Sequence, residues 1–136
     1  MQDGLRHIAL TDTVAAEPQI QPEDMAAVAA AGYKVVINNR PDGEALGQPS
    51  SEDLRRAAER AGLEYHYYPL NAFNYPGDEL PAITELFDNP ERPVFAFCRS
   101  GTRSTNLWIS SRAADARDDA RHHAQQLGFD VSMSKR

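Results

Sequence analysis

Residues 95–108, FAFCRSGTRSTNLW, combine an apolar run, the only cysteine of the chain and a polar loop that carries two arginines. A short apolar run of this kind is typical of a buried strand. A glycine in the loop and apolar residues after it indicate a turn into a helix. The stretch therefore predicts a strand over 93–97, a loop over Cys98–Ser104, named here the cysteine loop, and a helix that begins near Arg103.

Strand and helix patterns alternate along the rest of the chain. Because each crossover between neighbouring strands lies over a face of the sheet, such alternation implies mostly parallel pairing. We predict a single α/β domain over residues 1–136, with a small, mostly parallel sheet flanked by helices. The other expected elements are strands over 33–38 and 63–70, a hairpin from 5–10 and 14–16, and helices after Pro22, after a Ser50 cap, after an Asp78 cap and over 117–127.

The composition narrows the class of partner. The chain has 136 residues, a formal net charge of −6 and a pI of about 5.1, so its field would repel nucleic acid and anionic membranes. We see no signal peptide and no apolar run long enough to span a membrane. A single cysteine cannot form an intramolecular disulfide, which suits a reducing, cytoplasmic compartment. The histidines show no metal-ligand spacing, and neither a metal nor a cofactor is expected.

Three polar loops are expected at one edge of the sheet. Residues 39–47 follow one predicted strand, residues 71–77 follow the next, and the cysteine loop follows the third. Ligands of open parallel sheets bind where the carboxyl ends of the strands meet. The candidate site is therefore placed at this edge.

The cysteine loop has the make-up of an anion-binding site. Its backbone N–H groups can point inward, and the positive end of the next helix points at the same place. This setting favours a thiolate nucleophile at Cys98, with Arg103 holding an oxyanion through two donors. Gly101 permits close backbone approach, and we expect the Ser104 hydroxyl to hydrogen-bond the sulfur. The other residues that contribute anion-binding backbone N–H groups are Arg99, Ser100 and Thr102.

The simplest alternative is that Cys98 is a small apolar residue that ends a buried strand, as free cysteines often are. An isolated cysteine would be interpreted in that way. Here arginine, glycine, arginine and serine follow at the spacing of an anion cradle, so the sequence favours a nucleophile.

The segment CRSGTRS resembles the active-site loops of cysteine-based phosphatases and of rhodaneses. A phosphatase signature has five residues between cysteine and arginine, whereas four separate Cys98 from Arg103, which is the rhodanese length. Three stretches, at 35–50, 57–70 and 95–108, together resemble the phosphatase-like domain found fused to beta-lactamase-like hydrolases and also standing alone in bacteria. The resemblance covers about residues 5–112 and implies a cysteine-phosphatase fold of the dual-specificity type. Other motifs expected of a true rhodanese are missing.

The same resemblance raises the question of the general acid. Dual-specificity enzymes carry an aspartate about thirty residues before the cysteine, but residues 68–74 contain no Asp or Glu. Asp78 is the nearest substitute, and Asp42 and Glu44 in the 39–47 loop are the other candidates. Turn formation and helix capping are the alternative roles of these residues. Arg40 either adds positive potential to the pocket or forms a surface salt bridge.

Three hypotheses follow. The leading one is hydrolysis of a phosphate ester through a cysteinyl-phosphate at Cys98, with a small anionic substrate or a phosphorylated residue bound by the cysteine loop. The second is sulfur transfer through a persulfide on Cys98, which needs no general acid. The third is an anion-binding module without turnover. The sequence predicts no oligomeric state.

Overall fold

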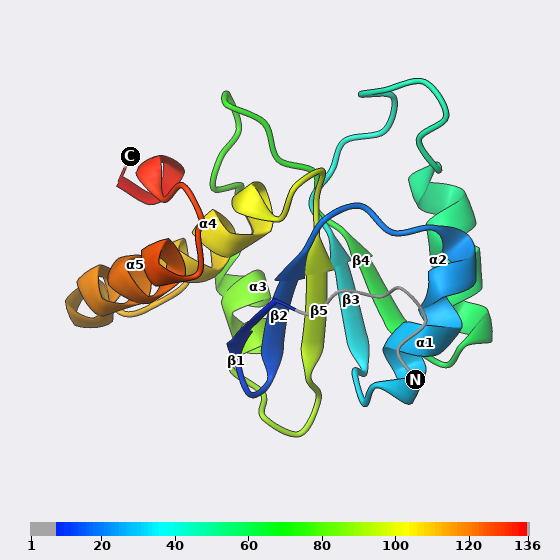
Figure 1. Cartoon of the computed structure of the whole chain (residues 1–136), viewed down its shortest axis with the longest axis horizontal. Helices are drawn as coiled ribbons and strands as arrows, with labels where there is room; N and C mark the ends of the chain where they lie inside the picture. Colours follow the sequence, from blue (N-terminus) through cyan, green and yellow to red (C-terminus); the bar gives the residue numbers. More distant parts are fainter. Residues whose placement is uncertain (1–7, 136) are drawn as a thin grey trace.

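The computed structural model describes residues 8–135 and consists of a five-stranded sheet between two layers of helices (Figure 1). The strand order is β1-β2-β5-β3-β4, and all neighbouring pairs are parallel except β1 with β2. This arrangement confirms the predicted α/β class and the mostly parallel sheet. The strands are β1 (Ala9–Thr11), β2 (Val14–Glu17), β3 (Val35–Asn38), β4 (Glu64–Tyr67) and β5 (Val94–Phe97).

The helices also follow the expected order. The predicted helix after Pro22 is divided into a 3₁₀ turn and a short α-helix, and the polar helix near the C-terminus begins at Arg117 as expected. The helical elements are η1 (Pro22–Asp24), α1 (Met25–Ala30), α2 (Ser51–Arg60), α3 (Leu80–Phe87), α4 (Thr102–Ser110), η2 (Ala114–Ala116), α5 (Arg117–Gln126) and η3 (Ser132–Lys135). Within residues 8–135, none of these is long and apolar enough to cross a membrane.

The alternation of side chains along β5 explains the two layers. Val94 and Ala96 face the core that contains α3, α4 and α5, whereas Phe95 and Phe97 face the core that contains α1 and α2. All four side chains are at most 1% exposed, as expected for a central strand covered on both faces. The cysteine loop therefore starts from the most enclosed strand of the sheet.

Two predictions about local structure had different outcomes. Ser50 caps α2 as expected, since its hydroxyl accepts a hydrogen bond from the Asp53 backbone N–H at 3.1 Å. The predicted Asp78 cap is wrong: α3 begins one residue later than such a cap requires, with Glu79 at the N-cap position and no side-chain cap. Pro81 lies in the first turn of α3, where its missing N–H leaves one fewer donor to satisfy.

The predicted N-terminal hairpin is present where it can be followed. β1 and β2 pair antiparallel, and β2 then pairs in parallel with β5. Residues 5–7 of the expected hairpin lie outside the described part of the chain. Because β3, β4 and β5 run in the same direction, the loops after them leave the same edge of the sheet, which is at the top of Figure 1.

Candidate active site

Cys98 lies directly after β5 and is 1% exposed. Its backbone N–H donates to the Glu17 carbonyl at 3.2 Å, which fixes the start of the cysteine loop against the end of β2. The Gly101 N–H donates to Cys98 Sγ at 3.1 Å. The loop therefore turns back on itself and presents a backbone donor to the sulfur, as the sequence predicts for this glycine.

Gly101 is the N-cap residue of α4 and has a φ of +92°. This left-handed conformation is costly for residues with a Cβ and allows the chain to turn sharply from the sulfur into the helix. α4 begins at Thr102, so the positive end of its backbone dipole lies at the cysteine loop. This is the strand, loop and helix arrangement predicted from residues 95–108.

Arg103 joins the three loops at the edge of the sheet. Its Nη1 and Nη2 atoms donate to the two carboxylate oxygens of Glu44 at 2.8 and 2.9 Å, and Nη1 also donates to the Leu70 carbonyl at 2.9 Å. The side chain is 17% exposed. Hydrogen bonding to Glu44 raises the pKa of Arg103, and the charge and hydrogen bonding of Cys98 also contribute to the increase. The guanidinium is therefore held in place beside the sulfur.

Glu44 is an ion-pair partner of two arginines. In addition to Arg103, the Nε of Arg40 donates to it at 3.0 Å. The hydrogen bond from Arg103, followed by that from Arg40, lowers the pKa of the Glu44 carboxyl. A carboxyl with a lowered pKa is ionised at neutral pH and has no proton to give. Glu44, which we considered as a general acid, is thus placed to orient Arg103.

Arg40 is buried and already paired. Its side chain is 6% exposed, and besides its bond to Glu44 it donates through Nη1 to the side-chain Oε1 of Gln19 at 3.0 Å. Of the two roles that the sequence left open for Arg40, the surface salt bridge is not found, because its ion pair with Glu44 is largely buried. Arg40 contributes positive charge behind Glu44, and its guanidinium is held by both of these protein side chains.

Ser104 and Asn39 form a buried hydrogen-bonded pair beneath the loop. Ser104 Oγ donates to Asn39 Oδ1 at 2.8 Å, and Asn39 Nδ2 donates to the Tyr68 carbonyl at 2.9 Å. Both Ser104 and Asn39 are 0% exposed. We expected the Ser104 hydroxyl to bond the sulfur, but its proton is directed to Asn39 instead. Asn39 was not identified from sequence, although its position directly after a buried strand is a signal of site-edge location.

Asp42 and Asp78 are not brought to the sulfur by any hydrogen bond. The Asp42 carboxylate accepts from the Ser51 backbone N–H at 2.8 Å, at the start of α2. Its backbone N–H donates to the Tyr67 hydroxyl at 2.9 Å. Asp78 is exposed, and in residues 8–135 its side chain makes no hydrogen bond or ion pair. The structure therefore assigns Asp42 a helix-capping contact and leaves Asp78 in solvent.

The remaining loop residues surround this centre. Arg99 is exposed, as expected for a residue that contributes its backbone, and its carbonyl accepts from the Gln19 N–H at 3.3 Å. Ser100 Oγ donates to Thr102 Oγ1 at 3.0 Å across the loop. Phe73, in the 71–77 loop, is 97% exposed.

Tyr75 is turned toward α4. Its hydroxyl donates to the Asn106 carbonyl at 2.6 Å. Its ring packs against the core on the α3, α4 and α5 side of the sheet. Tyr75 therefore ties the 71–77 loop to the helix that follows the cysteine loop.

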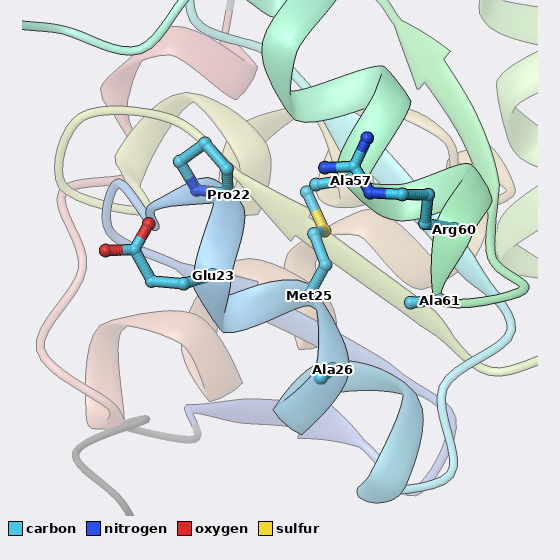
Figure 2. Close-up of a pocket in the computed structure, with 7 residues that line it drawn as sticks. All are labelled: Pro22, Glu23, Met25, Ala26, Ala57, Arg60 and Ala61. Carbon is cyan, nitrogen blue, oxygen red and sulfur yellow. The ribbon is translucent and has the colours of Figure 1, made fainter.

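The cavities found among the described residues include three that lie away from the cysteine loop, the third of about 310 Å³ and lined by Glu64 and Arg92 among others. One, of about 270 Å³, lies between η1, α1 and α2, and Figure 2 shows Arg60 and Met25 among its lining residues. Another, of about 330 Å³, is lined by residues of β4 and α3, such as Tyr67, Ile83 and Leu86. None of the three contains Cys98 or Arg103. Over the described range 8–135, no three His, Cys, Asp or Glu side chains are grouped to hold a metal ion.

Solved structures with this fold are cysteine phosphatases. A candidate phosphatase from Neisseria meningitidis superposes with a TM-score of 0.76 and 32% identity over 90% of this chain and 89% of that one. Tk-PTP in its active form has a TM-score of 0.71 at 16% identity over 93% and 89% of the two chains, and PTPMT1 has 0.69 at 14% over 96% and 90%. The last two likenesses establish the fold. They confirm the predicted cysteine-phosphatase architecture.

Curated relatives show the same relationship in sequence. The Beta-lactamase hydrolase-like protein of Agrobacterium fabrum is 34% identical over 127 residues, and that of Xylella fastidiosa strain 9a5c is 30% identical over 133. These matches cover 91% and 96% of this chain but only 29% and 31% of the relatives, so the chain spans about a third of their length. Residues 5–115 match the family described as Beta-lactamase hydrolase-like protein, phosphatase-like domain. The chain therefore belongs to this phosphatase-like domain family.

Proposed function

We propose that the protein is a cysteine-dependent phosphatase in which Cys98 attacks the phosphorus of a phosphate ester. The observation that carries this proposal is a buried sulfur that accepts the Gly101 N–H at 3.1 Å, in the same loop as an Arg103 guanidinium that Glu44 orients. Membership of a phosphatase-like family supports the same reaction. A neighbour of the same fold, TpbA of P. aeruginosa, is solved in complex with phosphotyrosine, which supports a phosphorylated residue as substrate.

The geometry of Arg103 defines how a phosphate would be held. Nη1 donates to Glu44 and Leu70, and Nη2 donates once to Glu44. A guanidinium has five N–H donors, so the Nε–H and one Nη2–H on its other edge make none of these three bonds; a bound phosphate would take them with two of its oxygens in place of the interaction with Cys98. The backbone N–H groups of the cysteine loop and the positive end of α4 supply further donors. Bound in this way, the phosphorus would face the sulfur.

The reaction would proceed in two displacements. The Cys98 thiolate attacks phosphorus, a P–S bond forms, and the ester P–O bond breaks with its electron pair leaving on the alcohol oxygen. Water then attacks phosphorus, the P–S bond breaks, and phosphate leaves with the thiolate regenerated. Arg103 and the loop N–H groups stabilise the charge on the phosphoryl oxygens in both steps.

The leaving oxygen must obtain a proton unless it is a weak base. Glu44 is ionised, Asp42 caps α2, and Asp78 has no bond to the loop. The proton is therefore supplied by water in this mechanism. Aryl phosphates, whose leaving groups are weak bases, are the substrates that such a site hydrolyses best.

Sulfur transfer is the second candidate, and the four-residue interval between Cys98 and Arg103 favours it. The thiolate would attack the sulfane sulfur of thiosulfate, the S–S bond would break, and sulfite would leave a persulfide on Cys98. Cyanide would then take the outer sulfur as thiocyanate and return the thiolate. Neither step needs a general acid, which fits the absence of a carboxyl hydrogen-bonded to the sulfur among the described residues.

One paired assay tests the two reactions. The wild-type protein and Cys98→Ser are each incubated with an aryl phosphate, and separately with thiosulfate and cyanide. We expect phosphate release by the wild type and none by Cys98→Ser. Thiocyanate formation without phosphate release would contradict the phosphatase and support sulfur transfer. Inactivity of the wild type in both assays would contradict both reactions and support an anion-binding module.

A further inference from the structure

The C-terminal segment, residues 117–135, lies outside the part of the chain that matches the phosphatase-like family. It contains α5 and η3 and lies beside α4, as the orange and red ribbon in Figure 1 shows. α4 is the helix that begins in the cysteine loop. The segment is therefore placed where it can act on the candidate active site.

Phe129 of this segment contacts the loop at Gly101. A Cβ atom built on Gly101 would lie 3.1 Å from Phe129 Cε1 and 3.4 Å from the Ala16 carbonyl oxygen. Gly101 is thus enclosed between the phenyl ring and the end of β2. This is the residue whose N–H donates to Cys98 Sγ at 3.1 Å.

The chain on both sides of Phe129 is held against α4 and α5, and the ring itself packs partly buried against the core. The Asn106 side chain, which is 0% exposed, donates to the Asp130 carbonyl at 2.8 Å and accepts from the Ser134 N–H at 2.9 Å. Val131 is 3% exposed in the core beside α4. The Phe129 N–H donates to the Ala124 carbonyl at 3.1 Å, at the end of α5. The residues on both sides of Phe129 are consequently anchored.

We propose that Phe129 is a positioning residue that holds the Gly101 N–H against the sulfur of Cys98. Glycine has no side chain to restrict its backbone, so it can readily leave the left-handed conformation. Neighbouring groups are needed to keep it there. A hydrogen bond to the charged form of an acid favours that form. Without the ring, Gly101 gains freedom, its N–H spends less time on the sulfur, and the thiolate forms at higher pH. The inference rests on Cys98 as the reactive thiol and is independent of whether phosphorus or sulfur is attacked.

The test is the rate of Cys98 alkylation by iodoacetamide across a pH series. Cys98 is the only cysteine of the chain, so the reaction reports on this site and needs no substrate. We compare Phe129→Ala and Phe129→Leu, which lack the ring, with Phe129→Tyr, which keeps it. Leu127→Ala, at a half-exposed residue of the same segment, is the matched control. Thermal unfolding of each protein shows whether it is folded.

We expect the midpoint of the alkylation profile to rise by about one pH unit in Phe129→Ala and Phe129→Leu. Phe129→Tyr and Leu127→Ala should keep the wild-type midpoint. A change in the plateau rate alone would show only altered access to the sulfur and would overturn the proposal. An unchanged midpoint in a folded variant without the ring would also overturn it.

If Phe129→Ala does not fold, Phe129→Leu provides the test of the proposal, because its side chain still fills part of the space. Failure of the phosphatase assay with a shifted midpoint would contradict the reaction and leave this inference standing.

Discussion

The Arg103 guanidinium and the Glu44 carboxylate form a two-pronged ion pair, with N···O distances of 2.8 and 2.9 Å, between residues from different loops. Two parallel hydrogen bonds fix the plane of a guanidinium as well as its position. The Glu44 side chain is 27% exposed and receives a further bond from the buried Arg40. The orientation of the residue expected to bind substrate is therefore set by the loop after β3.

Replacing Glu44 by glutamine should lower phosphatase activity more than it lowers stability. Glutamine keeps one acceptor oxygen but loses the charge and the second acceptor, so Arg103 is less well oriented. We expect kcat/KM with an aryl phosphate to fall about tenfold, which is about 1.4 kcal/mol of transition-state stabilisation. Glu52→Gln, which removes a carboxylate from an exposed ion pair on α2, is the control. An increase in activity would instead show that Glu44 competes with substrate for Arg103.

The same ion pair predicts a pH dependence of stability. Arg103, and then Arg40, lower the pKa of Glu44 in the folded protein. Such a group stabilises the fold at pH values above its unfolded pKa, and this stabilisation is lost as the pH falls through the lower, folded pKa. The difference in Tm between the wild type and Glu44→Gln should be constant near neutral pH. It should close below the ordinary glutamate pKa of 4.5. A difference that persists at the acid end of a thermal unfolding series would contradict the ion pair.

A lysine at position 103 should not supply the catalytic function of Arg103. A lysine ammonium cannot reach both Glu44 oxygens and the Leu70 carbonyl while it also presents a flat edge to a phosphate. We expect Arg103→Lys to lose about 100-fold or more in kcat with an aryl phosphate, as for loss of an oxyanion-binding donor. Arg56→Lys, an exposed arginine on α2, is the matched control. Equal loss in both variants would point to a general effect of the substitution.

The rate of phosphate-ester hydrolysis should depend more on the leaving group of the substrate than on Asp42 or Asp78. Because neither carboxylate is hydrogen-bonded to the cysteine loop, we expect aryl phosphates to be hydrolysed much faster than alkyl phosphates by the wild type. Asp42→Asn and Asp78→Asn should change the two rates by the same factor. The measurement is kcat for both substrate types in all three proteins. A loss confined to alkyl phosphates in one variant would identify that aspartate as the general acid.

Structural features that depend on residues close together in the chain were predictable from sequence. The strand over 94–97, the loop after it and the glycine at the start of the helix follow from an apolar run, a turn residue and helical spacing within one stretch. Likewise, alternating strands and helices predicted a mostly parallel sheet, and parallel strands place their following loops at one edge.

The contacts that complete the site join residues distant in sequence, and local patterns do not specify them. Glu44 was recognised as a loop residue of the site edge, but its lowered pKa is caused chiefly by the hydrogen bond from Arg103, which is 59 residues away. The Ser104 hydroxyl is directed to Asn39, 65 residues away, and not to the sulfur of Cys98 in the same loop. The expected Asp78 cap is wrong because α3 starts at Leu80, where Pro81 reduces the need for one.

The most direct test of the central claim is a search for the covalent intermediate. The protein is denatured rapidly during turnover of an aryl phosphate, and the peptide that contains Cys98 is examined by mass spectrometry, with Cys98→Ser treated in the same way. We predict a phosphoryl group on Cys98 in the wild type and no adduct on the serine variant. The absence of a phosphoryl adduct, together with an added sulfur on Cys98 after exposure to thiosulfate, would contradict the phosphatase.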